Sequence, residues 1–229
     1  MKYSLSVCLS TLAFATIVFS TASAQSPALQ KGVSVQMAAT TNATAFPQAD
    51  NEDAWIVAVT ADGSLYFGVK PVTVASLTEE MKSTPRRREA RLYVKADARA
   101  PFDAVKQALH AAQKDLFETA VLLTEQQPHA AEATIVPPQG LEVGLALPST
   151  TATVVELHNS GRPTPALKVN DQELPWSALQ TALAEASQGG RVKRVVLEAD
   201  GSLPFDEIVK VIDVSRSLGA KVAVSLAGL

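Results

Sequence analysis

The chain of 229 residues contains a single cysteine, Cys8, which lies in its first segment. If that segment is removed on export, the mature chain has no thiol, which excludes disulfides, thiolate catalysis and cysteine ligands to a metal. Basic residues are scattered, and the formal net charge is −3. A nucleic-acid-binding protein would instead carry a basic face, so the composition argues against that class.

The sequence has only one long apolar run, Leu5 to Phe19, and this run is shorter than the about 20 residues of a membrane-spanning helix. Ala22-Ser23-Ala24 follows it with the small residues that signal peptidase requires. We therefore expect residues 1–24 to be a signal peptide and the mature chain to begin at Gln25. The alternative is an uncleaved segment 5–20 that anchors the protein in a membrane.

The sequence also lacks the common catalytic and ligand-binding patterns. His110, His129 and His158 are isolated, and their spacing is not that of metal ligands. No Ser/His/Asp order, nucleotide-binding glycine loop or EF-hand pattern occurs. We therefore expect no enzymatic activity, no cofactor and no metal.

What the chain does contain is an internal repeat. The strand-like stretch Arg91–Asp97 returns as Arg194–Asp200, and Pro101-Phe102-Asp103 returns as Pro204-Phe205-Asp206, at a constant offset of 103 positions. Solenoid repeats run to about 20–50 residues, so a repeat of this length is a whole domain. The chain is expected to carry two copies of one small fold.

Each copy alternates between the hydrophobic period of a strand and that of a helix. Ala61-Asp62-Gly63-Ser64 joins two β-rich runs, which is a strong hairpin signal. Pro101 fits the first turn of a helix, and Asp103 follows where the helix dipole favours a carboxylate. The first copy is expected to have strands at 55–60, 65–69, 91–96 and 120–123, with helices at 77–84 and 101–116. The second copy is expected to have strands at 154–157, 166–169, 192–199 and 221–226, with helices from 175 and from 204.

The two long helices are expected to end differently. Gly219 lies just after the end of the second long helix, where a residue in the left-handed conformation commonly caps a helix, whereas the first copy has Leu116 at that position.

Between the copies lies the proline-rich span Gln126–Gly140, which favours an extended spacer. Upstream, Ala38–Glu52 shows little periodicity and is expected to be an irregular lead-in. The predicted fold class is α+β, with two tandem copies of a small two-layer domain of about four strands and two helices each. The expected divisions are the signal peptide 1–24, copy one with its lead-in at 25–126, the linker 127–140 and copy two at 141–229.

A family resemblance rests on the order of several short motifs. They are Gly32–Val35 and Gly140–Val143, the hairpin with 61–66, Leu92–Asp97 followed by Pro101-Phe102, and the closing Leu122-Leu123-Thr124. Together they resemble the periplasmic domain of the ExbD/TolR biopolymer-transport family, whose members are accessory subunits of the proton-driven Ton and Tol motors of bacterial inner membranes. The resemblance implies a periplasmic, non-enzymatic module that binds a TonB- or TolA-like protein or peptidoglycan.

Two departures from the family matter. Its members have an N-terminal transmembrane helix with an aspartate that takes part in proton flow, whereas Leu5–Phe19 contains no carboxylate. An ionisable residue at membrane depth is costly and is kept for function, so its absence argues against a motor role. Members also have one such domain per chain and work in pairs, so the duplication predicts an internal pseudo-dimer.

An enzyme remains the rival class, because Asp97 and Asp200 each follow a buried strand, where loop residues often act in catalysis. Glu198 lies close to Asp200, but Lys95 takes its place in the first copy. Loop aspartates more often accept hydrogen bonds from nearby amides. The residues expected to serve structure or partner contact are Asp97, Pro101, Phe102, Asp200, Pro204 and Phe205.

The sequence thus favours a periplasmic adaptor of ExbD/TolR type without the proton-motor role. The alternatives are a periplasmic peptidoglycan- or ligand-binding protein unconnected to a motor and, less favoured, an uncharacterised hydrolase.

Overall fold

The computed structural model describes residues 33–85, 87, 89–126, 137–145, 152–186 and 194–227. The expected signal peptide, most of the expected linker and His129 lie outside these ranges. Within them the protein is a mixed α+β fold with a 13-stranded sheet and the four helices α1 to α4.

Apart from one 3-10 turn in the second copy, the two copies contain the same elements in the same order. The first copy comprises β3 (Trp55–Val59), β4 (Leu65–Phe67), β5 (Lys70–Val72), α1 (Val74–Ser83), β6 (Leu92–Ala96), α2 (Phe102–Lys114) and β7 (Thr119–Gln126). The second comprises β9 (Thr153–His158), β10 (Ala166–Val169), β11 (Gln172–Leu174), the 3-10 turn η2 (Trp176–Ala178), α3 (Leu179–Ala186), β12 (Arg194–Ala199), α4 (Phe205–Ser217) and β13 (Lys221–Val224). The sequence missed β5 and β11, which are only three residues long.

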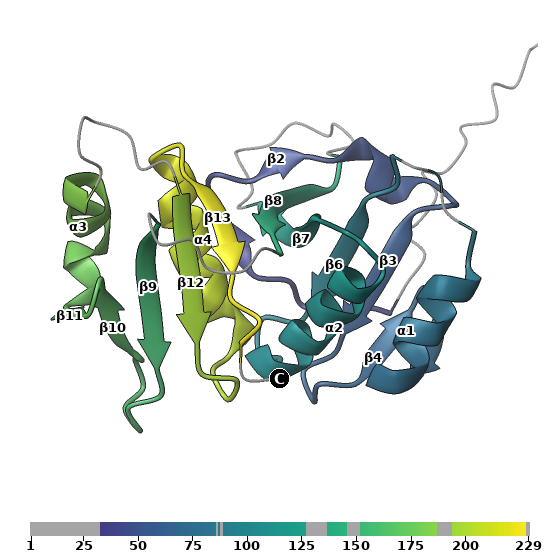
Figure 1. The fold of residues 1–229 in the computed structure, drawn as a ribbon, viewed down its shortest axis with the longest axis horizontal. Helices are drawn as coiled ribbons and strands as arrows, with labels where there is room; N and C mark the ends of the chain where they lie inside the picture. The colour runs from purple at the N-terminus through teal and green to yellow at the C-terminus, as the bar shows by residue number, and fades with distance from the viewer. Residues whose placement is uncertain are drawn as a thin grey trace, which may run out of the picture.

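The strands of both copies merge into one sheet instead of forming two. Its order is β11-β10-β9-β12-β13-β8-β7-β6-β3-β4-β5, which Figure 1 shows as a continuous row from the green to the blue end. The strand β8 (Gln139–Gly144) joins the halves, because it pairs antiparallel with β7 and parallel with β13. Gln139 and Gly140, placed in the linker from the sequence, are therefore part of this strand.

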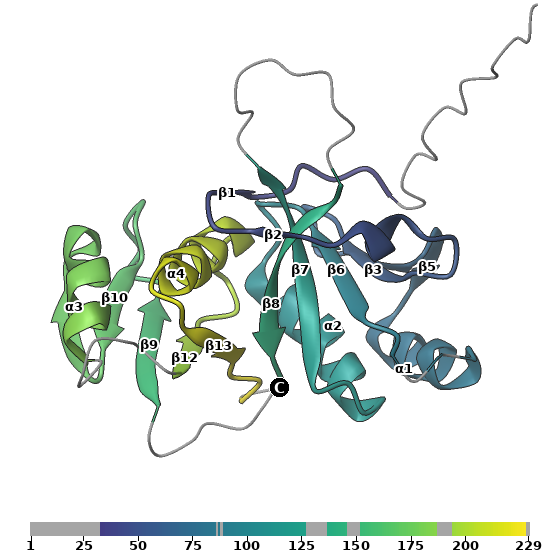
Figure 2. The ribbon, with the colours of Figure 1, turned by 90° about the horizontal axis from the view of Figure 1, so that it is seen from above.

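The helices of the two copies pack on the same face of a twisted sheet, because Val143 of β8 pairs with both Ala120 of β7 and Val222 of β13, and all three belong to the common core. Because the sheet twists between the copies, Figure 2 shows α1 and α2 below the strands of the first copy and α4 above β12 and β13. Alternate residues of the strands point at these helices, so Val57 and Val94 in the first copy and Val155 and Leu197 in the second belong to one hydrophobic core.

The lead-in is more ordered than expected, with the short strands β1 (Ala39–Thr40) and β2 (Thr44–Ala45) and the 3-10 turn η1 (Pro47–Asp50). Phe46 and Ala49 pack on the face of the first copy that its helices leave open, against Ile56, Tyr93 and Val121. The lead-in therefore forms a second small core, which a search for regular periodicity cannot find.

The lead-in also binds the second copy. The carboxylate of Asp213 on α4 accepts hydrogen bonds from Thr41 N (3.1 Å), Thr41 Oγ1 (2.8 Å) and Asn42 N (2.8 Å). A segment near the start of the described chain is thus attached to a helix near its end.

The two long helices end in the same way, contrary to the expectation from sequence. Gly219 adopts the left-handed conformation with φ 76°, and Leu116 adopts it as well with φ 63°. Leu116 N and Gly219 N donate to the carbonyl oxygens of Gln113 and Arg216, the residues three positions earlier. The first copy therefore keeps the cap geometry and accepts the strain of a leucine with its Cβ close to the following carbonyl oxygen.

Replacing Leu116 with glycine should stabilise the protein. The left-handed conformation costs a residue with a Cβ about 1–2 kcal/mol, and glycine loses about 0.5–1 kcal/mol more in conformational entropy on folding, which leaves a gain of about 0.5–1 kcal/mol. The Leu116 side chain is 82% exposed, so its removal sacrifices little packing.

Urea denaturation of Leu116→Gly should show a higher midpoint than the parent. The matched control is Gly219→Ala, which introduces a Cβ into open space at a positive φ and should lower the midpoint. A lower midpoint for Leu116→Gly would contradict this account of the strain.

Candidate functional site

The two copies of the repeated Pro-Phe-Asp motif face each other, with Pro101 and Pro204 opposite one another in an antiparallel bridge. Four hydrogen bonds run from the first amides of each helix to carbonyl oxygens of the other copy, and the 103-residue offset relates them in pairs. They are Phe102 N to Leu203 O (2.8 Å), Asp103 N to Gly201 O (2.8 Å), Phe205 N to Ala100 O (2.9 Å) and Asp206 N to Ala98 O (2.9 Å). We call residues 98–103 and 201–206 the junction.

The junction satisfies groups that each helix would otherwise leave unpaired. The first amides of an α-helix have no partner within the helix. Pro101 and Pro204 occupy the N-cap positions of α2 and α4, not the first turn as expected, and neither provides a side-chain cap. Each copy therefore caps the main helix of the other. The missing N–H of each proline costs nothing, because the pair lies at a position of the bridge where no amide is required.

Close packing accompanies these hydrogen bonds. A Cβ built on Gly201 would lie 2.8 Å from Cβ of Asp103, so the backbones approach this closely only because residue 201 is glycine. Behind the contact, Phe102 and Phe205 are completely buried in the common core.

The two repeated aspartates have different surroundings. Asp97 is 4% exposed and accepts hydrogen bonds from Gln36 N (3.1 Å) and from Arg99 N (3.1 Å), Nε (2.8 Å) and Nη2 (3.0 Å). The pKa of Asp97 lies well below its usual range, mainly because the Arg99 side chain donates hydrogen bonds to the carboxylate. This carboxylate connects the lead-in to the loop that precedes α2.

Asp200 is more exposed, and its carboxylate accepts a hydrogen bond from Asn159 N at 2.8 Å. His158, which looked isolated in the sequence, is not isolated in the structure. Its Nδ1 lies 3.5 Å from Oδ1 of Asp200, and its Nε2 lies 3.0 Å from Oε2 of Glu156. The sequence did not indicate this cluster, because the sheet register brings its members together.

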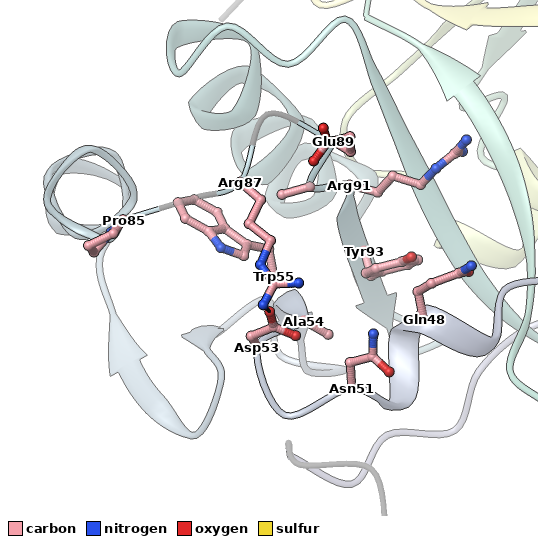
Figure 3. A pocket seen from close by; sticks show the side chains of 11 residues that line it. Gln48, Asn51, Asp53, Ala54, Trp55, Pro85, Arg87, Glu89, Arg91 and Tyr93 are labelled. Atoms are coloured by element: carbon pink, nitrogen blue, oxygen red, sulfur yellow. Dashed lines mark ion pairs between the residues drawn. The ribbon is translucent and has the colours of Figure 1, made fainter.

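A cavity of about 710 Å³ opens at the amino-terminal ends of β3 and β6, away from the junction. Figure 3 shows Arg87 and Arg91 along one side, Gln48 and Asn51 across from them, and Tyr93 between Arg91 and Gln48. Other lining residues include Asp53, Trp55 and Glu89.

The floor of this cavity is aromatic and its rim is polar. Tyr93 is 2% exposed, and its burial raises its pKa, which Arg91 partly opposes. Trp55 is 5% exposed and packs on Phe67 and Phe117, so it belongs to the core. Arg91 is paired with Glu142 at 2.7 Å and Arg87 with Asp53 at 3.4 Å, so both cations of the rim already have acidic partners.

The described residues offer neither a metal site nor a membrane-spanning helix. No group of three or more His, Cys, Asp or Glu side chains in these ranges is placed to hold a metal ion. None of the helices within them combines the length and the apolar character that crossing a bilayer requires.

Comparison with known families decides the relationship. The family model of Biopolymer transport protein ExbD/TolR matches the chain twice, at residues 7–127 and at residues 128–227. The chain belongs to the ExbD/TolR family. No curated protein and no solved structure matches it. The two matches confirm the resemblance and agree with a duplicated ExbD/TolR domain. This family is associated with transport and is not an enzyme family.

In this ExbD/TolR chain, sequence reasoning missed three residues that shape the site. Arg99 was not singled out, although an arginine two residues after a buried aspartate is a recognisable ion-pair signal. Gly201 could be found only by comparing the copies, because the first copy has Ala98 there. Lys95 is 9% exposed, and burial lowers its pKa; nothing in its local sequence indicated this.

Substituting Gly201 with alanine should destabilise the whole protein. The added methyl would overlap Asp103 and push the copies apart, and overpacking of this kind costs about 1–3 kcal/mol. Gly144→Ala is the matched control, because its Cβ would meet neighbours at 3.6 Å or more, an ordinary contact. Thermal unfolding should show a lower midpoint for Gly201→Ala only. Equal effects of the two substitutions would argue against close packing at the junction.

Asp97→Asn should cost about 2 kcal/mol at pH 7, because it weakens several hydrogen bonds to a buried carboxylate, whereas Asp200→Asn should cost less. Since the pKa of Asp97 is lower in the folded state, its contribution is complete above its unfolded pKa of about 4 and is lost as pH falls below that value.

Urea denaturation at pH 7, 5 and 3 should therefore show the stability gap between the parent and Asp97→Asn narrowing only at pH 3. A gap that is constant over this range would contradict the assignment.

Proposed function

We propose that this chain is a non-enzymatic periplasmic adaptor of a Ton- or Tol-like system, and that it binds a partner without driving proton flow. The observation that carries the proposal is the junction, through which one ExbD/TolR chain supplies a complete pair of modules. Tethering makes their association intramolecular, with an effective concentration of about a millimolar for a short linker. Such a chain has no need of a second subunit to form the pair.

The apolar run near the start of the sequence has no acidic residue, which supports the proposal that this chain does not drive proton flow. Leu5–Phe19 contains no carboxylate, so even if this segment were retained in a membrane it could not carry a proton through an aspartate. The small residues at 22–24 support cleavage of residues 1–24 and release of the mature chain into the periplasm.

The proposed partner is a TonB- or TolA-like protein, since the family works with such proteins. Peptidoglycan is a second candidate, and the cavity of Figure 3 favours it. Its size lies within the range of about 300–1,000 Å³ that is usual for small-ligand sites, and it combines an aromatic floor with a few polar groups. The amides of Gln48 and Asn51 are suited to sugar hydroxyls.

Affinity capture and co-sedimentation with purified sacculi distinguish these partners. The tagged mature chain should recover a TonB- or TolA-like protein from envelope extracts and should remain in the supernatant when sacculi are pelleted. Asn51→Ala serves as a control, because it alters the cavity and should leave protein capture unchanged. Sedimentation with sacculi that Asn51→Ala abolishes, without capture of such a protein, would establish the second candidate instead.

The lack of a motor role predicts a failure of complementation. In a strain that lacks its motor-type ExbD, expression of this chain should not restore growth that depends on siderophore uptake. Immunoblotting of the periplasmic fraction provides the expression control. Restored growth from this chain alone would contradict the proposal.

A further inference from the structure

The merged sheet has two outer strands, β5 and β11, and both are second arms of tight hairpins. Gly68 has φ 62° at the first position of the turn between Phe67 and Lys70, as a type II′ turn requires. Asn170 and Asp171 have φ 49° and 67°, as in a type I′ turn. In such two-residue turns the closing residue pair is hydrogen-bonded, and the next pair is not.

This alternation determines which backbone groups of each outer strand face away from the sheet. In β5 the non-hydrogen-bonded pair is Tyr66 with Pro71, and in β11 it is Lys168 with Glu173. The N–H and C=O of Glu173 therefore point outward. Pro71 holds the same place in the first copy and has no N–H, so that edge lacks its donor.

The two edges thus differ in their capacity to accept another strand. Proline on an outer strand is a known protection against pairing with a further chain. The first copy carries this protection within its outer strand, whereas the second copy has its proline, Pro175, only after β11 ends. Because the two hairpins are equivalent, the difference lies in the residue type and not in the fold.

A cavity of about 730 Å³ adjoins the unprotected edge. Leu174, Pro165 and Trp176 give it an apolar lining, and the indole Nε1–H of Trp176 donates to Pro165 O at 2.9 Å, which fixes the ring. Arg162 is an exposed cation on its rim and forms no ion pair with any residue that the structure describes. The site combines an outward amide, an apolar recess and an exposed positive charge.

We propose that β11 is a docking edge for an extended segment of a partner protein. The segment pairs with the N–H and C=O of Glu173 as an added strand, places an apolar side chain against Trp176, and carries an acidic residue that faces Arg162. Backbone pairing supplies orientation, and the recess and the charge supply selectivity. This inference rests on the proposed function as a protein-binding adaptor and adds the surface and the chemistry of the partner segment.

The test uses linear peptides from a phage-displayed library, selected on the full mature chain and then synthesised. Their affinity is compared for the parent, Glu173→Pro and Glu173→Ala. Proline removes the outward N–H and leaves the pairing with β10 intact, as Pro71 shows in the equivalent strand. Alanine removes the carboxylate and keeps the N–H.

Glu173→Pro should weaken binding about tenfold, the effect of about one hydrogen bond, and Glu173→Ala should change it less than threefold. Arg162→Glu should weaken the peptides that carry an acidic residue. In the parent, addition of peptide should slow hydrogen exchange of the Glu173 amide, a measurement that needs no variant to fold. Unchanged exchange, equal affinities for the proline and alanine variants, or no selected peptide would overturn the proposal.

Envelope capture separates this inference from the proposed function. If the parent and Glu173→Pro recover a TonB- or TolA-like protein equally, the adaptor role stands and the docking edge is wrong. If the parent recovers no such protein and sediments with sacculi, the adaptor role itself fails.

Discussion

The fold depends on the helices α2 and α4, whose first backbone amides have no hydrogen-bond acceptor within their own copy. Each begins after a proline that offers no side-chain cap, and its first amides must find acceptors elsewhere. The repeat supplies them reciprocally, since the loop before each helix presents its carbonyl oxygens to the other helix. A buried N–H without an acceptor costs about 1–3 kcal/mol, so four such groups are a strong reason for the copies to stay together.

Outside the junction the two copies differ. Once they are fixed in one chain, each position of the pair can change independently. The first copy has the buried Asp97 paired with the exposed Arg99, it has the covering lead-in, and it has Pro71 at its outer edge. The second copy has kept an open edge and the His158 cluster. A symmetric frame thus presents two different surfaces, which suits an adaptor better than two equal ones.

Much of this architecture could be predicted from the sequence, because the strands β3 and β6 and the helices α2 and α4 have strong local periods. The predicted site residues Pro101 and Pro204 do meet, although no local pattern shows that they meet each other. The conformation of Leu116 was predicted wrongly. Glycine is preferred in a left-handed helix cap by only about 1–2 kcal/mol, and packing elsewhere can outweigh that preference. The difference between Asp97 and Asp200 arises mainly from Arg99, in whose place the second copy has Ser202, and also from Gln36, which is distant in sequence and pairs with only one of the two aspartates.

The shared strand β8 has a consequence for the order of folding. It belongs by sequence to the second copy, yet it completes the sheet of the first by pairing along β7. The first backbone amides of α2 likewise donate to carbonyl oxygens that lie about a hundred residues further along the chain, so they have no acceptor until that part has been synthesised. Contacts of such high sequence separation slow folding. The first module to be synthesised therefore cannot be the first to finish folding, and the chain becomes native only when almost all of it is present.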